Sequence, residues 1–244
     1  MPPRIPPDRV GTVVVAAARV FVRHGYRRAQ VQDVADELGV AKGTVYGYAA
    51  SKEALLAAAI RYGDGLEPLP GVSDLPLPTP PEGAVAELVT ERLGAEVAQL
   101  AVVRASGGDG GAPGVTVADV VLDLYARLAR HRIAIKIVDR CGAELPELGR
   151  VWFGDGRRAQ VGVLDAYLSG LERAGRLTLP GPAPLVARTI VESCALWAVH
   201  CHFDPAAALD PDAADGTDAV DDAAVAPMLA ALFTRGTALI VPAT

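Results

Sequence analysis

The stretch VQDVADELGVAKGTVYGY, residues 31–48, decides the fold of the chain's N-terminal part. Its first eight residues, 31–38, carry small and aliphatic side chains at helical spacing and predict a short helix. Gly39 can adopt the positive φ that ends a helix, and residues 42–48 predict a second short helix that buries Val45. Two short helices joined by a glycine-containing turn are typical of a helix-turn-helix unit.

The charge of the chain divides into a basic N-terminal part and an acidic remainder. Residues 1–62 carry a net charge of +4, whereas residues 63–244 carry a net charge of −10. Phosphate groups respond to local charge, because salt screens electrostatic interactions beyond about 10 Å. The overall net charge of −6 is therefore compatible with nucleic-acid binding by the N-terminal part.

Composition favours a helical protein that is not exported. The 244 residues are 51% hydrophobic but only 5% aromatic, which argues against disorder and against an aromatic-rich β-sandwich. Three cysteines are too few, and odd in number, for a disulfide framework. No run approaches the roughly 18 apolar residues of a membrane span. Arg19 interrupts an N-terminal run that mimics a signal peptide, so we expect a cytoplasmic protein without a membrane partner.

The rest of the chain predicts helices separated by loops. Residues 63–83 contain six prolines and four glycines and predict a linker or ordered loop, and residues 204–222 carry seven aspartates and predict a solvated acidic loop. No strand-like alternation has a useful length, so we expect an all-α protein of about nine helices. Beyond the N-terminal module, periodicity and Gly or Pro stops place helices at about 84–105, 115–141, 147–174, 184–202 and 222–240.

Residues 16–26 (AAARVFVRHGY), 31–48 and 51–56 (SKEALL) together closely resemble the DNA-binding domain of TetR-family transcriptional regulators. The resemblance implies a helix-turn-helix DNA-binding domain at 1–50 and a larger ligand-binding and dimerisation domain at 51–244. It implies a homodimer, paired through its last two helices, that binds a palindromic operator on double-stranded DNA. A small-molecule effector would release it, so the first expectation is a repressor.

The resemblance also implies which residues contact DNA. Lys42 would donate to a guanine or a phosphate, and the hydroxyls of Thr44 and Tyr46 would suit phosphates. The alternative for each tyrosine is packing within the module. Ser51 is a good N-cap for the helix that follows. The expected DNA-binding residues are Arg28, Gln30, Lys42, Gly43, Thr44, Tyr46, Gly47, Tyr48 and Lys52.

Two positions depart from the family pattern. Ala49 stands where the family usually has Phe, and losing a buried ring costs about 3–5 kcal/mol if nothing refills the space. Gln30 stands where Thr commonly caps the second helix and touches phosphate. These departures leave open an alternative function, a ligand-binding helical dimer with a DNA-incompetent head.

The resemblance implies an apolar effector cavity in the helical body. His131 lies on an apolar face of the predicted helix 115–141, where it would orient a polar ligand group or serve as a hydrogen-bonded core residue. The large aromatic side chains would line the cavity or fill the core. The candidate ligand-binding residues are Tyr125, His131, Trp152, Phe153, Tyr167 and Trp197.

Neither a metal nor a catalytic site is expected. His200, Cys201 and His202 are consecutive, and adjacent helical residues point about 100° apart, so they cannot converge on one ion. Cys194 and Cys201 share a face, which leaves metal or thiol sensing as a minor alternative. The chain lacks a phosphate-binding G-x-x-x-x-G-K-[ST] loop, an H-E-x-x-H motif and a nucleophile elbow, so we expect no cofactor and no enzyme activity.

Overall fold

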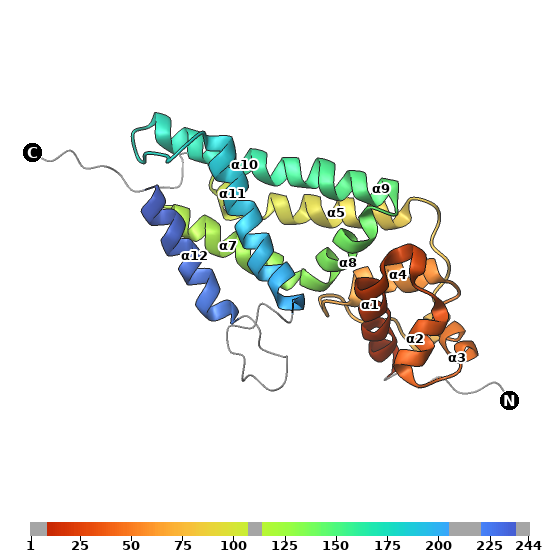
Figure 1. The fold of residues 1–244 in the computed structure, drawn as a ribbon. Helices are drawn as coiled ribbons and strands as arrows, with labels where there is room; N and C mark the ends of the chain where they lie inside the picture. The colour runs from red at the N-terminus through yellow and green to blue at the C-terminus, as the bar shows by residue number, and fades with distance from the viewer. Residues whose placement is uncertain (1–8, 107–113, 205–220, 238–244) are drawn as a thin grey trace, which may run out of the picture. The chain divides into compact units, whose positions relative to one another are not determined.

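A computed structural model describes residues 9–106, 114–204 and 221–237 (Figure 1). Their regular elements are helices, which confirms the predicted all-α class; one isolated β-bridge joins Ala49 to Leu77. None of the described helices is long and apolar enough to span a membrane. Most of the predicted acidic loop 204–222 lies outside the described residues.

The chain divides into two compact units. Unit 1 contains Met1–Glu91 and His131–Gly154, and unit 2 contains Arg92–Arg130 and Asp155–Thr244. The fourth and eighth helices both pack against the first and join its unit. The functional domains 1–50 and 51–244 stay a prediction, because the two units describe packing only.

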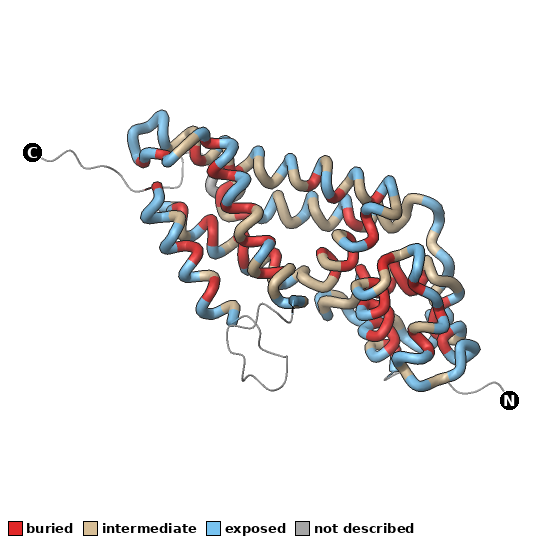
Figure 2. Tube along the Cα trace, in the orientation of Figure 1, coloured by how far each residue is buried: buried red, intermediate tan, exposed pale blue. Residues whose placement is uncertain are grey.

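Unit 1 is built around α1 (Arg9–Arg28), whose apolar face is buried. Phe21 is 1% exposed, and Leu55 and Ile137, from two helices that pack on α1, are 2% and 0% exposed (Figure 2). The other elements are α2 (Val31–Leu38), α3 (Lys42–Tyr46), α4 (Lys52–Tyr62), η1 (Val72–Asp74), the start of α5 (Ala84–Ala98), α8 (Arg132–Gly142), α9 (Pro146–Gly149) and most of the π-helical turn η2 (Arg150–Gly156).

In unit 2, α7 (Val117–Arg130) packs against α11 (Ala183–Ala195) and α12 (Asp222–Gly236), and α11 also packs against α10 (Arg157–Arg173). Arg127 ties α7 to α5, since its guanidinium bonds the Glu96 carboxylate at 2.8 Å. Short elements complete the unit: α6 (Ala101–Ser106), η3 (Leu196–His200) and η4 (Cys201–Phe203).

Two predicted helices are each interrupted by a break. The predicted helix 115–141 breaks at His131, and 84–105 breaks between α5 and α6. At the first break the Asp64 carboxylate accepts hydrogen bonds from the backbone N–H groups of Ile133, at 2.8 Å, and Ala134, at 3.1 Å. At the second, the Asp123 carboxylate accepts from Ala101 N–H at 2.8 Å. Each break exposes first-turn N–H groups, and a carboxylate distant in sequence satisfies them.

The later predicted helices also end or change pitch early. The predicted helix 147–174 starts as α9, passes through the π-helical turn η2 and continues as α10. The predicted helix 184–202 is regular only to Ala195 and then continues as η3 and η4. In the last predicted helix, 222–240, the regular part ends at Gly236, and its final three positions lie outside the described residues.

Candidate nucleic-acid interface

The turn between α2 and α3 has the predicted geometry. Gly39 lies in the left-handed region, at φ 65° and ψ 35°, and its N–H and that of Val40 close the end of α2. Ala35 and Val45 are both 0% exposed, so the two helices pack on small side chains as the sequence predicts. Helix α3 ends at Tyr46, two residues earlier than predicted, and the half-buried Gly47 caps it.

The outer side of α3 carries exposed polar side chains. Lys42 and Thr44 are exposed, and Tyr46 is 42% exposed with its ring centroid 6.0 Å from the Lys42 ammonium nitrogen. An ammonium group and two hydroxyl groups on a short helix match the acceptors of base edges and phosphates. We define the recognition surface as the exposed members of the predicted set: Arg28, Gln30, Lys42, Gly43, Thr44 and Tyr46.

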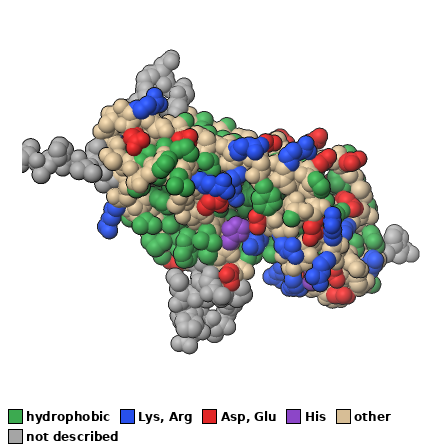
Figure 3. All heavy atoms as spheres, turned by 45° about the horizontal axis from the view of Figure 1, so that its top comes forward, with side chains coloured by type: hydrophobic (Ala, Val, Ile, Leu, Met, Phe, Trp, Pro, Cys, Tyr) green, Lys and Arg blue, Asp and Glu red, His purple; other side chains and the backbone are tan. Residues whose placement is uncertain are grey.

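Basic side chains elsewhere on helices α1 to α4, which we call the head, are partly neutralised by acidic side chains. Figure 3 shows Lys and Arg side chains interspersed with acidic ones on this part of the molecule. Arg19 and Arg23 of α1 both pair with Glu37 of α2, at 3.5 and 3.2 Å. These ion pairs tie α1 to α2, so the recognition surface relies on Arg28 and Lys42 for positive charge.

Helix α2 begins with a backbone cap, made by Asp33, that the sequence analysis above does not predict. Gln30 is the N-cap residue, but its side chain makes no capping hydrogen bond and is exposed. Instead, Asp33 accepts a hydrogen bond from the Gln30 backbone N–H at 2.7 Å. This is the reciprocal half of a capping box, and it leaves the Gln30 amide available to a ligand. The predicted N-cap of α4 is confirmed, because Ser51 Oγ accepts from Ala54 N–H at 3.2 Å.

Tyr48 and Lys52, both expected at the DNA, have other partners. Tyr48 is only 4% exposed, so the packing alternative holds for this tyrosine. The Lys52 ammonium donates to the carbonyl oxygens of Tyr26, at 3.0 Å, and Ala29, at 3.2 Å, and lies 4.3 Å from the Tyr26 ring centroid. It therefore satisfies backbone carbonyl groups at the C-terminal end of α1, beyond the break in the helix at Gly25, rather than projecting toward phosphate.

The proline-rich segment, residues 63–83, compensates for the small residue at position 49. Leu77 N–H donates to the Tyr48 carbonyl, and Ala50 N–H donates to the Leu77 carbonyl, both at 2.9 Å. Ala49 is 2% exposed, and the cavity that it lines with Leu77 and Leu55 has a volume of about 10 Å³. Such a space holds at most about one water molecule. Leu77 therefore refills the region where the missing ring would lie. No sequence pattern near Leu77 or Ala49 predicts this contact.

The six candidate ligand residues are divided equally between unit 1 and unit 2. Two are already engaged: the hydroxyl of Tyr125 donates to Asp222 at 2.7 Å, and that of Tyr167 donates to the Val115 carbonyl at 2.8 Å. Trp152 is 7% exposed, whereas Phe153 is 51% exposed. His131 is the N-cap residue of α8, at the break in the predicted helix 115–141, so it does not lie on a continuous apolar face. Trp197 lies in η3. Burial in helix cores accounts for Tyr125 and Trp152.

Two of the three cysteines, Cys141 and Cys194, are buried, whereas Cys201 is half-buried. Burial raises the pKa of the Cys194 thiol to about 12, and that of Cys141 also to about 12. Thiols with raised pKa values are poor nucleophiles and poor metal ligands at neutral pH. Across the described residues no group of three or more His, Cys, Asp or Glu could hold a metal ion.

Comparison with known proteins identifies the N-terminal part. Residues 13–59 match the family described as bacterial regulatory proteins, tetR family. Over 65 residues the chain is 42% identical to the HTH-type transcriptional activator FasR of Mycolicibacterium smegmatis. That match covers 26% of this chain and 30% of the relative, so it spans less than a third of the relative's length.

Solved structures share the fold over nearly the whole chain. The ketosteroid transcriptional regulator KstR2 of Mycobacterium tuberculosis has a TM-score of 0.57 at 16% identity, with 94% of each chain covered. A tetR-family regulatory protein from Rhodococcus RHA1 has a TM-score of 0.52 at 14% identity, with 95% of this chain and 98% of the other covered. The family match therefore falls on the helix-turn-helix and its recognition surface, and the fold of the whole chain is similar to that of a tetR-family structure.

Proposed function

We propose that the protein is a homodimeric transcriptional regulator that binds a palindromic DNA site through α3 and is released by a small-molecule effector. The observation that carries the proposal is the placement of Lys42, Thr44 and Tyr46. All three are exposed on a short helix. Val45, which is 0% exposed, anchors this helix. A rigidly anchored helix with exposed donors suits the major groove.

Exposed apolar side chains on the last helices support a dimer. Leu185, at the start of α11, is 61% exposed, and Met228 and Leu232 on α12 are 49% and 60% exposed. Figure 3 shows hydrophobic side chains gathered on the face of unit 2 that it presents. A twofold interface of this kind pairs the same surface on both copies, and two recognition helices then demand a near-palindromic site.

The experiment is selection of binding sites from a random duplex library with the full chain, followed by a salt titration of the best site. We expect a palindrome and a steep dependence on salt, since each phosphate contact adds about 0.9 to the log–log slope. The double variant Lys42→Ala, Tyr46→Ala should lower specific affinity at least about 100-fold while the dimer persists, because each good base contact is worth about 1–3 kcal/mol.

Arg158→Ala is the matched control, because it removes one positive charge from an exposed side chain of α10. It should leave binding unchanged. Normal binding by the double variant would refute the assignment of α3. A folded dimer that enriches no sequence would instead favour the DNA-incompetent alternative, which rests on Gln30 and Ala49. Transcription from the selected site, with the regulator present or absent, distinguishes repression from activation, which is the role named for the relative from Mycolicibacterium smegmatis.

A further inference from the structure

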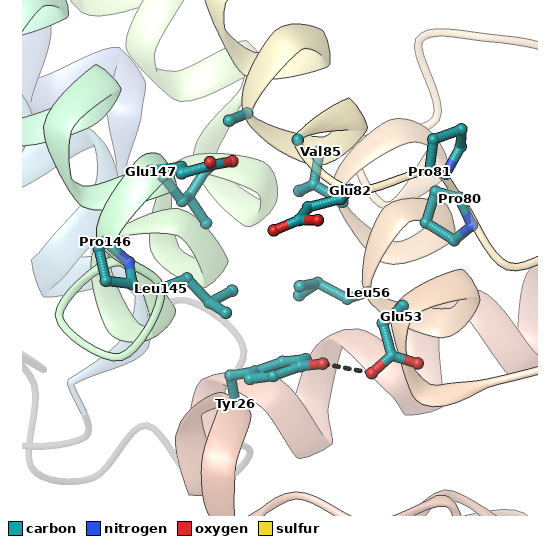
Figure 4. Close-up of a pocket in the computed structure, with 13 residues that line it drawn as sticks. Tyr26, Glu53, Leu56, Pro80, Pro81, Glu82, Val85, Leu145, Pro146 and Glu147 are labelled. Carbon is teal, nitrogen blue, oxygen red and sulfur yellow. Dashed lines mark hydrogen bonds between the residues drawn. The ribbon is translucent and has the colours of Figure 1, made fainter.

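Unit 1 contains a cavity that none of the six candidate ligand residues lines. Its volume is about 500 Å³, within the range of small-molecule sites. Its walls come from α1, α4, the start of α5 and the segment around α9 (Figure 4). Aliphatic side chains and prolines form most of the lining, among them Leu56, Val85, Leu145 and Leu148.

All the ionisable groups that line this cavity are acids. Glu53 accepts a hydrogen bond from the Tyr26 hydroxyl at 2.5 Å and is thereby engaged on one side of the cavity. Glu82 and Glu147 lie on the other side (Figure 4), and both are exposed at the rim. No ion pair to either carboxylate is present among the described residues.

The two rim carboxylates come from segments that are far apart in sequence. Glu147 lies on α9, and its Oε2 atom is 3.5 Å from the position that a Cβ atom would take at Gly83, next to Glu82. Like charges that share a site repel each other, and a cation between them relieves the repulsion. An apolar interior with an acidic rim therefore suits a ligand with a hydrocarbon body and one cationic end, and disfavours an anion.

We propose that this cavity is an effector site for a small aliphatic amine, whose ammonium group lies between Glu82 and Glu147 and whose hydrocarbon part contacts Leu56 and Val85. This inference rests on the proposed function, because it names the class of effector. It places the effector site against the DNA-binding head itself, apart from the aromatic residues singled out in the sequence.

Two wall segments connect the cavity to the recognition surface. Pro80, Pro81 and Glu82 follow Leu77 in the proline-rich segment, and Leu77 is hydrogen-bonded to the residues directly after α3. On the other wall, Leu145 follows Glu144, whose carboxylate accepts a hydrogen bond from the Arg27 backbone N–H at 2.5 Å. Arg27 precedes Arg28 of the recognition surface. A ligand that prefers one arrangement of these walls therefore alters the affinity of the head for DNA.

The test is calorimetric titration of the full chain with n-octylammonium, 1-octanol and octanoate, without DNA. We expect the ammonium to bind tightest and octanoate weakest. The double variant Glu82→Gln, Glu147→Gln should lower ammonium affinity about tenfold or more and leave 1-octanol affinity unchanged. Glu87→Gln, an exposed glutamate of α5 that does not line the cavity, is the matched control. Equal affinities for the three probes, or an unaltered ammonium affinity in the double variant, would overturn the assignment.

A second variant, Ala86→Phe, fills the cavity and should abolish binding of both the ammonium and the alcohol while the chain keeps its helical circular dichroism. The effect on function is read separately, as the affinity for the selected DNA site with and without n-octylammonium. We expect a loss of DNA affinity, and binding of the amine with unaltered DNA affinity would refute an effector role. Because the calorimetry uses no DNA, failure to find any DNA site would reject the proposed function without deciding the cavity, which the titration decides by itself.

Discussion

Residues 31–48 and residues 63–83 both shape the DNA-binding head, but they are specified in opposite ways. In the first region the geometry follows from neighbours in sequence, as in the left-handed Gly39 and the buried Val45. In the second, Leu77 takes its place because of the backbone of Tyr48 and Ala50, nearly thirty residues away. The first region presents most of the recognition surface, and the second is hydrogen-bonded to the residues that follow α3.

The largest expected change in stability comes from removing the side chain of Leu77. Leu77→Ala removes the side chain that fills the region beside Ala49, and we expect the free energy of unfolding to fall by about 2 kcal/mol, the low end for Leu→Ala because Leu77 is half-buried. Urea unfolding of the full chain measures it. Val72→Ala is the control, because Val72 lies in the same segment but is 46% exposed.

A double-mutant cycle sharpens this interpretation. If Leu77 occupies the space of an absent ring, Ala49→Phe should destabilise the chain that retains Leu77, since overpacking costs about 1–3 kcal/mol. In the Leu77→Ala background the same Phe should be neutral or stabilising. Additive effects of the two changes would mean that the side chains do not share one space.

A second, smaller effect tests the distant cap of α8. Asp64→Ala leaves the N–H groups of Ile133 and Ala134 without their acceptor, and we expect a loss of about 1 kcal/mol in the free energy of unfolding. Asp74→Ala is the control, because within the described part of the chain its carboxylate accepts a single hydrogen bond, from Gly71 N–H in an exposed turn. A loss at Asp74 as large as that at Asp64 would argue against α8 capping as the cause of the break at His131.

The same contrast explains what could be predicted from the sequence. The helix-turn-helix and the Ser51 cap depend on residues within a few positions of each other, and the sequence predicts both. The break at His131 depends on Asp64, and the end of α5 depends on Asp123 of α7, so periodicity alone continued both helices too far. The family pattern predicts Tyr48 and Lys52 at the DNA from their positions in the sequence alone. In the structure, Tyr48 is buried and its backbone is bonded to Leu77, and Lys52 is hydrogen-bonded at the end of α1.

The cavity of unit 1 could not be found in the sequence for the same reason. Its rim acids, Glu82 and Glu147, are separated by the whole of α7 and α8, and neither belongs to a motif. Of the aromatic residues that composition singled out, Tyr125 and Trp152 are buried, whereas Phe153 is exposed. Acidic residues at helix starts are common, so only the fold reveals that these two face one cavity.

The smallest expected effect concerns the hydrogen bond between Tyr26 and Glu53, which joins α1 to α4 at the floor of that cavity. The hydroxyl lowers the pKa of the Glu53 carboxyl below its ordinary value of 4.5, and burial followed by this hydrogen bond raises the pKa of Tyr26. Tyr26→Phe should cost at most about 1 kcal/mol of unfolding free energy at neutral pH, because the pair is partly exposed.

The pH dependence of that cost identifies its source. A carboxyl whose pKa is lowered in the folded state contributes its full stabilisation above the unfolded value, near 4.5, and loses it as the pH falls through the folded value. The difference between the parent chain and Tyr26→Phe should therefore be constant from neutral pH down to about pH 5 and shrink below it. A difference that persists unchanged into acid would mean that the lost hydroxyl acts through packing rather than through Glu53. If the hydroxyl acts through packing, Tyr26→Phe should cost the same unfolding free energy in the parent chain and in the Glu53→Gln variant. If it acts through the Glu53 carboxylate, Tyr26→Phe should cost less in the Glu53→Gln variant.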